Sequence, residues 1–549
     1  MIHAKIVSSL EKCFLDSNIE DFKALTRISM LKNERLSVQF LYTADENEAQ
    51  HTRMKIQVKG APALHCTVRT VESVPVKYAA PIPAGDNYLR TTPGLYPDVL
   101  QPLHYHGCVT AMRGYTQSAW IEFDPQGKLA AGVYSVAVTL RREGKDILTK
   151  VFDIEIIDAN LPEQEMRFTQ WFHCDCLANY YGCEVWSERH WEIIENFART
   201  AVRNGINMLL TPVHTASLDT ERGGERRTTQ LVDIKRDGGV YSFNFDKLDR
   251  WIEMCNRVGI KYFEIAHFFT QWGAEHAPKI MVTVDGEYKR LFGWDTDATG
   301  EEYSTFLHAY IPALLDHMKA RGDDKRCYFH ISDEPNKEQL DSYRAAKNVV
   351  KDLLDGYPIM DALSNFEYWS QGIVETPIPS NNHIEPFIEA KVPGLWTYYC
   401  CSQYKDVSNR FIAMPLWRTR SIGMQFYKYD IAGFLQWGYN FYSNCHSVDV
   451  IEPFMETSGE YWVSAGDTHS VYPAQDGTAM ESIRIISFYE ALQDARAMKL
   501  AEKAYGKERV VAEIEKIFGK ELRFDTCATD SATMLAIREK INEMIKEAI

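Results

Sequence analysis

The sequence lacks a long uninterrupted apolar stretch. The first segment, Met1 to Asn18, carries charges at Lys5, Glu11 and Lys12 and contains no apolar core of a secretory signal. No other segment reaches the roughly 20 apolar residues of a membrane-spanning helix. We therefore expect no membrane insertion and a cytoplasmic location.

Basic residues are in the minority. The 549 residues include 60 Lys and Arg against 76 Asp and Glu, so the formal net charge is −16. Nucleic acids and anionic membrane surfaces select for clustered Lys and Arg. The charge balance argues against both partners and favours a neutral substrate.

The cysteines show no disulfide pattern. Twelve are scattered at irregular positions, including the neighbours Cys400 and Cys401. Disulfide-stabilised domains are usually short and have closely spaced cysteines. The irregular spacing indicates free thiols in a reducing compartment.

What the sequence does contain is enough apolar material for a large folded protein. Apolar residues make up 45% and charged residues 25%, which is ordinary globular composition. A chain of 549 residues exceeds what one hydrophobic core usually supports. We therefore expect two or more packed units.

The first unit follows a period of two from about Glu34 to Ile157. Met54, Ile56 and Val58 alternate with polar residues, and prolines and glycines divide the segment into short runs. This pattern is typical of half-buried antiparallel strands. We predict an N-terminal β-sandwich over residues 1–160, ending in a polar stretch with a proline over residues 158–165.

After Arg167 apolar strands alternate with amphipathic helices. Helices are predicted over residues 188–204, 246–257, 304–321, 337–354, 481–499 and 531–548. Strands are predicted at Phe168 to Cys174, Ile206 to Pro212, Ile260 to His267, Cys327 to Ile331, Ile359 to Leu363, near Ile384, at Leu395 to Cys400 and at Gly433 to Trp437. Strands and helices in alternation predict a (β/α)8 barrel over residues 166–500, with an open doubly wound sheet as the alternative. Residues 501–549 are predicted to form a C-terminal helical segment.

Polar residues follow several of the predicted barrel strands. In such barrels the active site forms at the C-terminal ends of the strands. Burying polar groups there without partners would be costly, so they indicate a site. The residues at these ends are His173, Asp175, Thr211, His214, Glu264, His267, Asp333, Glu334, Ser364 and Asn365.

Two neighbouring carboxylates, Asp333 and Glu334, end the fourth predicted barrel strand. Adjacent residues of a strand point to opposite faces, so both can enter one cleft only if the strand bends, which Pro335 makes plausible. Close carboxylates push their pKa values apart and leave one protonated near neutral pH, as acid catalysis requires. The alternative is that Asp333 caps the next helix and Glu334 is merely exposed.

Histidines and cysteines near the strand ends raise the alternative of a metal-dependent hydrolase. None of them has HxH or CxxC spacing, so we predict no metal and no cofactor. The residues are His173, Cys174, Asp175, Cys176, His214, His267 and His330. We favour the interpretation that the histidines are hydrogen-bonded residues of the cleft or the core. The charged run Glu221 to Arg227 is interpreted as a solvated loop, with a lid over the cleft as the alternative.

A set of short motifs in fixed order resembles glycoside hydrolase family 123, whose members are β-N-acetylgalactosaminidases with an N-terminal sandwich and a barrel. The resemblance covers nearly the whole chain. The motifs are Phe172–Ala178 (FHCDCLA), Leu210–Pro212 (LTP), Ser332–Pro335 (SDEP), Leu395–Tyr398 (LWTY), Gly433–Gly438 (GFLQWG) and Gly466–Pro473 (GDTHSVYP).

The resemblance implies an exo-acting, retaining enzyme that hydrolyses a terminal β-linked N-acetylhexosamine of an oligosaccharide or glycoconjugate. The 2-acetamido oxygen of the sugar would attack and form an oxazolinium intermediate, an exception to the usual scheme of two carboxylates. Glu334 would be the acid and base, and Asp333 would stabilise the acetamido group. The other implied substrate-binding residues are Tyr398, Trp396, Trp437, Asp467, His173, Asp175, His214 and Asn365.

Three alternatives stay open at this point. The first is a catalytically silent carbohydrate-binding protein on the same scaffold, and the second is the metal-dependent hydrolase. The third is a conventional double displacement in which Glu264 is the nucleophile opposite Glu334. For each implied contact residue, a structural role in the core or a loop is an equal alternative.

Overall fold

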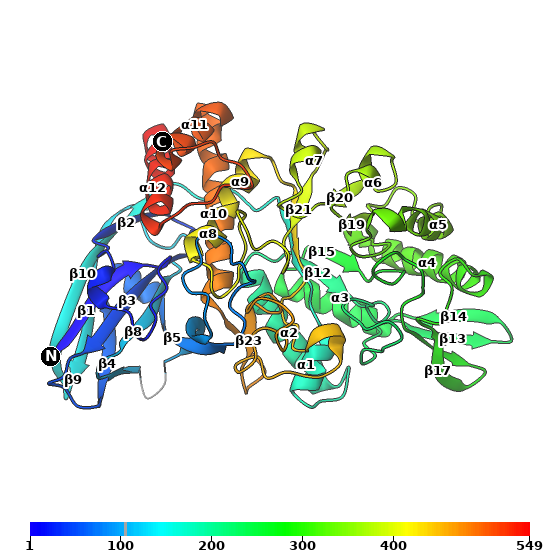
Figure 1. The fold of residues 1–549 in the computed structure, drawn as a ribbon, viewed down its shortest axis with the longest axis horizontal. Coiled ribbons are helices and arrows are strands. Elements are labelled where there is room, and N and C mark those ends of the chain that lie inside the picture. Colours follow the sequence, from blue (N-terminus) through cyan, green and yellow to red (C-terminus); the bar gives the residue numbers. More distant parts are fainter. Residues whose placement is uncertain (104–106) are drawn as a thin grey trace.

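The computed structural model describes residues 1–103 and 107–549. Two mainly antiparallel sheets at the N-terminus stand beside a large parallel barrel, and three helices end the chain (Figure 1). None of the helices among the described residues is both long and apolar enough to cross a membrane.

The N-terminal unit is a sandwich of two five-stranded sheets. One sheet has the order β1 (Ile2–Ser8), β3 (Leu36–Ala44), β8 (Thr116–Phe123), β5 (Cys66–Val76) and β6 (Gly94–Pro102). The other has the order β2 (Arg27–Leu31), β10 (Lys145–Ile157), β9 (Gly132–Arg142), β4 (His51–Lys59) and β7 (Cys108–Met112). Met54 and Ile56 of β4 are buried while Lys55 between them is exposed, as the period of two predicts. The predicted sandwich is therefore confirmed, although its strands begin earlier than Glu34.

The second unit is a closed barrel of eight parallel strands. In order around the barrel they are β11 (Arg167–Gln170), β12 (Met208–Thr211), β15 (Tyr262–Ile265), β18 (Cys327–Tyr328), β19 (Met360–Ala362), β20 (Thr376–Ile378), β21 (Trp396–Tyr398) and β22 (Gly433–Gln436). Single parallel bridges join Phe329 to Ile359 and Ser380 to Tyr398, and β22 pairs with β11. The predicted barrel is confirmed, because the ring closes and leaves no open sheet edge.

Helices follow the barrel strands on the outside. In α2 (Glu188–Arg203) the apolar positions Trp191, Ile194 and Phe197 recur at helical spacing and are buried. The Ser187 hydroxyl accepts a hydrogen bond from the backbone N–H of His190 and so caps this helix. Further barrel helices are α3 (Asp246–Val258), α4 (Glu301–Arg321) and α5 (Leu340–Val350).

Three sequence-based expectations differ from the structure. The strand predicted near Ile384 is wrong, since Ile384 precedes helix α7 (Glu385–Glu389), where Pro386 favours a helix start. A further four-stranded sheet was not predicted. It lies in the connections after β12 and β15 and consists of β13 (Asp233–Asp237), β14 (Val240–Asn244), β16 (Ile280–Val284) and β17 (Glu287–Phe292). Helix α10 (Ile483–Tyr505) runs through the predicted boundary at residues 500–501.

The C-terminal helices join the two units. They are α10, α11 (Lys507–Phe518) and α12 (Ser531–Ala548). Figure 1 shows α10 running between the sandwich and the barrel, and α12 packs on β2, where Glu539 accepts a hydrogen bond from the Ser29 backbone N–H at 2.9 Å. The tail thus packs on the sandwich as well as on the barrel.

A largely buried group of charges, which we name the junction cluster, links the sandwich to the barrel, with Arg203 as its exposed member. It consists of Glu122, Glu481, Arg35, Arg69 and Arg203. Arg69 and Arg203 each pair with both glutamates, one glutamate from the sandwich and one from the segment before α10. The two units are therefore held by buried ion pairs as well as by apolar packing.

Candidate active site

A cavity lies at the C-terminal ends of the barrel strands. Five of the residues that the sequence predicted for the site line it: His173, Asp333, Glu334, Tyr398 and Trp437. They come from positions after β11, β18 and β22 and from β21 itself, which are far apart in the sequence. The remaining wall residues include Trp171, Leu218, Asp219, Gln271, Trp272, Cys400, Cys401, Leu435 and Trp462.

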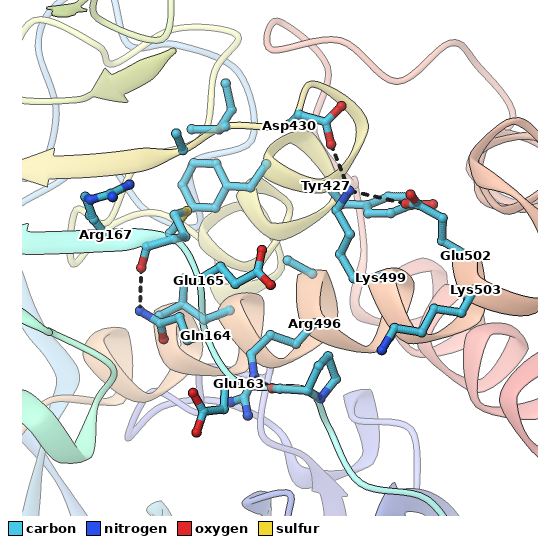
Figure 2. A pocket seen from close by; sticks show the side chains of 17 residues that line it. Glu163, Gln164, Glu165, Arg167, Tyr427, Asp430, Arg496, Lys499, Glu502 and Lys503 are labelled. Atoms are coloured by element: carbon cyan, nitrogen blue, oxygen red, sulfur yellow. Dashed lines mark hydrogen bonds and ion pairs between the residues drawn. The ribbon is translucent and has the colours of Figure 1, made fainter. Parts of the chain in front are cut away.

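A larger cavity lies at the opposite end of the barrel, where β11 and β22 begin (Figure 2). It measures about 590 Å³ against about 120 Å³ for the cavity at the strand ends. Three of its charged residues pair with one another, since Lys499 lies 2.8 Å from Asp430 and 3.3 Å from Glu502. Size therefore does not identify the active site, and the strand ends remain the better candidate.

The backbone turns sharply between the two carboxylates. Glu334 has a φ of 43°, in the left-handed region that few residues other than glycine adopt. Its N–H donates to the carbonyl of Ala362 at 3.0 Å, and the carbonyl of Asp333 accepts from the N–H of Trp272 at 2.9 Å. This conformation lets two adjacent side chains enter one cavity, which a straight strand would forbid.

The surroundings of the pair favour its protonated form. Burial is the main cause that raises the pKa of Asp333 well above its ordinary value, and the Glu334 carboxylate raises it further. Burial also raises the pKa of Glu334, although the Tyr398 hydroxyl opposes this change. Glu334 is exposed at the cavity mouth while Asp333 is buried, so we regard the shift of Asp333 as the larger one. Two interacting carboxylates in such a place share one proton near neutral pH.

The charge of His330 opposes the rise in the pKa of Asp333 without reversing it. Within the described part of the chain, no arginine or lysine forms an ion pair with Asp333 or Glu334. The Tyr398 hydroxyl donates to Glu334 Oε1 at 2.7 Å, and the Cys400 Sγ lies 4.0 Å from the same oxygen. Burial raises the pKa of Tyr398 well above its ordinary value, so this donor keeps its proton.

Trp437 forms a wall of the cavity and is held by Asp467. The indole N–H of Trp437 donates to Asp467 Oδ2 at 3.0 Å, and Gln436 Nε2 donates to Asp467 Oδ1 at 3.1 Å. Asp467 is fully buried and lies outside the cavity lining. Its position suits orienting Trp437 and differs from the predicted contact with a sugar hydroxyl.

His173 reaches the cavity, but both of its ring nitrogens are engaged. Nε2 lies 2.9 Å from the carbonyl of Trp437, and Nδ1 lies 3.1 Å from the Arg226 guanidinium. Burial, followed by the Arg226 charge, lowers the pKa of His173 to about 3, so the ring is neutral. The cation next to Nδ1 places the single ring proton on Nε2.

Asp175 does not line the cavity. Both of its oxygens accept hydrogen bonds from Arg226 at 2.7 Å in a buried bidentate pair. Arg226 belongs to the charged run Glu221 to Arg227, which the sequence suggested to be a solvated loop or a lid over the cleft. One arginine of this run is in fact buried and ties the loop to the first strand end.

Three further predicted contact residues also lie outside the cavity lining. His214 is fully buried and its Nε2 lies 2.8 Å from the carbonyl of His267. Asn365 accepts a hydrogen bond from the Glu367 N–H at 2.9 Å, next to helix α6 (Glu367–Ser370). Trp396 packs in the barrel interior on Gly433, where an added Cβ would come within 2.1 Å of the indole. Each of these three side chains therefore contacts the fold rather than the cavity. The sequence could not predict this, because a strand pattern alone does not fix side-chain direction.

The sequence pattern missed several cavity residues. Asp219 has a side-chain oxygen, Oδ2, that is buried without a hydrogen-bond partner, and burial raises its pKa to about 7 although Arg226 opposes the change. Trp272 follows the third strand after a loop and has a φ of 61°. Both lie in connections without periodicity, so only their aromatic or acidic character could have suggested them.

Glu264 lies below the cavity rather than in it. It is fully buried, accepts a hydrogen bond from the Trp171 indole N–H at 2.8 Å, and its Oε1 lies 2.8 Å from His330 Nε2. This position does not suit the alternative in which Glu264 is a nucleophile.

One group among the described residues has donors of a metal-binding type. Ligand atoms of His267, His330 and Asp361 lie within 4.8 Å of one another. The rings of His267 and His330 are stacked at 4.1 Å with 17° between their planes, so their in-plane lone pairs do not converge on one point. Both ring nitrogens of His330 are already hydrogen-bonded. Although both ring nitrogens of His267 are buried without a hydrogen-bond partner, the stacked rings and the engaged His330 do not suit a metal.

Comparison with known proteins gives an independent result. Residues 171–501 match the model of the glycoside hydrolase 123 catalytic domain. A family 123 glycoside hydrolase from Clostridium perfringens, described for glycolipid glycan hydrolysis, superposes with a TM-score of 0.76 at 15% identity, covering 100% of this chain and 99% of its own. A family 5 xyloglucanase from Bacteroides ovatus covers 87% of this chain and 100% of its own at 9% identity, but its TM-score of 0.29 supports no inference. No curated protein matches the sequence.

The family match spans more than half of the chain and contains the whole cavity with both carboxylates. The full-length superposition adds that the sandwich and the C-terminal helices share the fold of a family 123 protein. The chain belongs to glycoside hydrolase family 123 and is a glycoside hydrolase.

Proposed function

We propose that this enzyme is an exo-acting, retaining β-N-acetylgalactosaminidase that works through the 2-acetamido group of its substrate. The observation that carries the proposal is the pair Asp333 and Glu334, which enter one cavity from adjacent positions with no basic partner among the described residues. Adjacent side chains are too close to flank a sugar ring as acid and nucleophile, which need about 5 Å or more between them. They can act together on one side of the sugar.

In the proposed first step Glu334 protonates the glycosidic oxygen while the acetamido oxygen attacks the anomeric carbon. Asp333 accepts a hydrogen bond from the acetamido N–H and stabilises the positive charge of the oxazolinium intermediate. In the second step Glu334 removes a proton from water, which opens the intermediate with retention of configuration. Tyr398, which donates to Glu334 in the free protein, lies where it can reach the acetamido oxygen instead.

The location of the shared proton supports these roles. In the free protein burial favours the proton on Asp333 more than on Glu334. A substrate N–H that donates to Asp333 stabilises its ionised form and so lowers its pKa. The proton then resides on Glu334, where the first step needs it.

The walls of the cavity suit a neutral sugar. Trp171, Trp437 and Trp462 line it together with aliphatic side chains, and flat aromatic faces pack well against the apolar face of a pyranose. A cavity of about 120 Å³ favours one terminal residue over a long glycan chain. We propose that this residue ends an oligosaccharide or glycoconjugate; the relative from Clostridium perfringens is described for glycolipid glycans.

We also propose a reducing compartment such as the cytoplasm for this enzyme. All twelve cysteines are free, and the adjacent Cys400 and Cys401 lie in the wall of the cavity. Measuring activity with and without a thiol reductant, with free-thiol titration, tests this expectation.

The decisive experiment compares two aryl β-galactosides that differ only at carbon 2. The substrate with a 2-acetamido group should turn over, and the substrate with a 2-hydroxyl should be nearly inert. A thiazoline analogue of the intermediate should inhibit far more tightly than free N-acetylgalactosamine, as analogues of high-energy species do. Asp333→Asn should weaken this inhibition, because it removes the charge opposite the ring nitrogen.

Two outcomes would contradict the proposal. One is rapid hydrolysis of the 2-hydroxyl substrate. The other is a covalent adduct with a 2-fluoro sugar on Glu264, detected by mass spectrometry, which a double displacement predicts. Binding of the sugar without turnover of any aryl glycoside would instead support the silent carbohydrate-binding protein.

A further inference from the structure

Three fully buried ionisable residues link three neighbouring barrel strands next to the cavity. Asp361 on β19, His330 after β18 and Glu264 on β15 are each 0% exposed. His330 Nδ1 lies 3.0 Å from Asp361 Oδ1, and His330 Nε2 lies 2.8 Å from Glu264 Oε1. Burying three ionisable side chains costs stability unless they are paired, so their retention calls for a physical reason.

Asp361 holds the backbone that leads to the catalytic pair. The N–H of Ile331 donates to Asp361 Oδ1 at 3.1 Å, and the N–H of Ser332 lies 3.5 Å from Oδ2. The Tyr343 hydroxyl donates to Oδ2 from helix α5. One carboxylate thus holds the backbone N–H groups of the two residues directly before Asp333.

Glu264 holds a wall of the cavity at the other end. Its Oε1 accepts a hydrogen bond from the Trp171 indole N–H at 2.8 Å, and its Oε2 accepts from the Thr169 hydroxyl. Trp171 lines the cavity, whereas Glu264 itself does not. The chain of hydrogen bonds therefore runs from the strand end of Asp333 to the indole on the opposite wall.

His330 is the charged link between the two carboxylates. Burial lowers the pKa of His330, but hydrogen bonds and charges of Asp361 and Glu264 outweigh it and raise the value to about 9. His267, stacked on His330, is neutral, since burial and the His330 charge lower its pKa well below the ordinary value. The link is thus a single imidazolium between two carboxylates.

We propose that Asp361, His330 and Glu264 form a positioning relay that touches no substrate atom and sets the placement of Asp333 and Trp171. This inference rests on the proposed function, because it assigns the relay to the same catalytic pair. The charge of His330 also favours the ionised form of Asp333, which that pair needs in the complex. The other ionisable groups that act on Asp333 are Glu334, Asp361 and Asp219.

The test uses Asp361→Asn in the full-length enzyme with an aryl 2-acetamido-β-galactoside. We expect kcat to fall about 100-fold, the size of effect that a 1 Å misplacement causes, with KM changed by less than about threefold. Tyr343→Phe removes only one hydroxyl from Asp361 and should give a smaller loss of kcat in a protein that folds normally. Asp494→Asn is the matched control, since Asp494 is also buried and bonded by Arg420 and Arg538 but lies in α10. It should lower Tm and leave kcat of the folded enzyme unchanged.

The pH profile separates positioning from a general loss of structure. His330→Gln removes a cation near Asp333, so the acidic limb of kcat/KM should move to higher pH. Asp361→Asn removes an anion, so the same limb should move to lower pH. Equal shifts in both variants, or wild-type kcat in folded Asp361→Asn, would overturn the relay, as would a stoichiometric metal that Asp361→Asn releases.

Failure of the relay and failure of the proposed function give different results. If Glu334→Gln is inactive and Asp361→Asn is not impaired, only the relay is wrong. If Glu334→Gln keeps wild-type turnover, the catalytic assignment is wrong and the relay inference falls with it.

Discussion

Glu481 in the junction cluster and Asp333 in the cavity are both buried carboxylates, but only Glu481 has arginine partners. Burial raises the pKa of Glu481, yet Arg69, Arg203 and Arg35 outweigh it and bring the value below the ordinary range. Burial and Glu334 instead raise the pKa of Asp333. Burial raises the pKa of both carboxyl groups, and the charges of their neighbours decide whether the net shift is upward or downward.

The difference separates a structural site from a catalytic one. Ion pairs in the junction cluster stabilise the folded state, because each arginine loses its partner on unfolding. The pair in the cavity, which has no arginine or lysine partner among the described residues, costs stability at neutral pH and keeps a proton available for chemistry. Substitutions in the junction cluster should therefore change stability, and substitutions in the cavity should change activity.

The largest effect is expected for Glu334→Gln. This change removes the proton donor and should lower kcat by about 10² to 10⁴-fold on a substrate with a poor leaving group. Because it also removes one member of a strained carboxylate pair, Tm at pH 7 should stay equal or rise. Steady-state kinetics and a thermal melt measure both. Near-wild-type kcat would refute the assignment of Glu334.

The second effect is expected for Glu481→Gln in the junction cluster. It leaves Arg69 and Arg203 with Glu122 as their remaining partner in the cluster, so the cost should lie at or below the about 3–5 kcal/mol of unfolding free energy that a fully broken buried pair costs. The kcat of the folded enzyme should not change. Glu188→Gln is the matched control, because Glu188 pairs with Arg250 on the surface and should barely affect stability. Urea unfolding of both variants decides the point.

The pH dependence of stability follows from the same shift. The folded-state pKa of Glu481 is depressed, so its contribution is complete above its unfolded value of about 4.3 and is lost as the pH falls below that value. Glu481→Gln should therefore flatten the loss of stability between about pH 5 and pH 2. A variant that is destabilised equally at all pH values would contradict this account.

A smaller effect is expected for Asp219→Asn in the cavity. The buried oxygen of Asp219 without a partner is well placed to accept a hydrogen bond from a sugar hydroxyl. Losing a hydrogen bond to a charged group costs about 1.5 kcal/mol or more, so kcat/KM should fall roughly tenfold. Substrates that lack one hydroxyl at a time identify the partner, since the matching deoxy substrate should lose its sensitivity to the substitution. Unchanged kcat/KM on every substrate would rule out the contact.

The smallest effect is expected for metal removal. A strong chelator should leave activity unchanged, because the atoms of His330 and Asp361 are occupied by hydrogen bonds. Elemental analysis before and after treatment provides the control. Stoichiometric zinc together with lost turnover would favour the metal-dependent hydrolase.

Much of the fold could be predicted because the periodic spacing of apolar residues along the chain indicates its strands and helices. Period two in β4 and helical period in α2 each report which face is buried, and both agree with the structure. The strand β20 (Thr376–Ile378) was misplaced because Pro377 lies within it and Pro379 follows it, and prolines argue against a strand. Asp333 and Glu334 were found because they directly follow a buried strand.

The other cavity residues could not be derived in this way. Trp396 and Tyr398 lie two positions apart on β21, yet Trp396 packs on Gly433 in the barrel interior and Tyr398 reaches Glu334. The tilt of the strand and the bulk of its neighbours decide this difference. Asp175 was placed in the site on its strand-end position, but Arg226, 51 residues away, binds both of its oxygens.

The sequence by itself determined the sandwich, the alternation that closes into a barrel and the position of the adjacent carboxylates, because these depend on periodicity and on neighbours along the chain. Only the tertiary structure decided which acids became ion pairs and which kept a proton. A pKa depends on charges within a few ångströms, and folding brings those charges from distant segments, such as Arg69 to Glu481 and His330 to Asp361. The left-handed turn at Glu334 belongs to the same class, since the carbonyl of Ala362 on a neighbouring strand holds it.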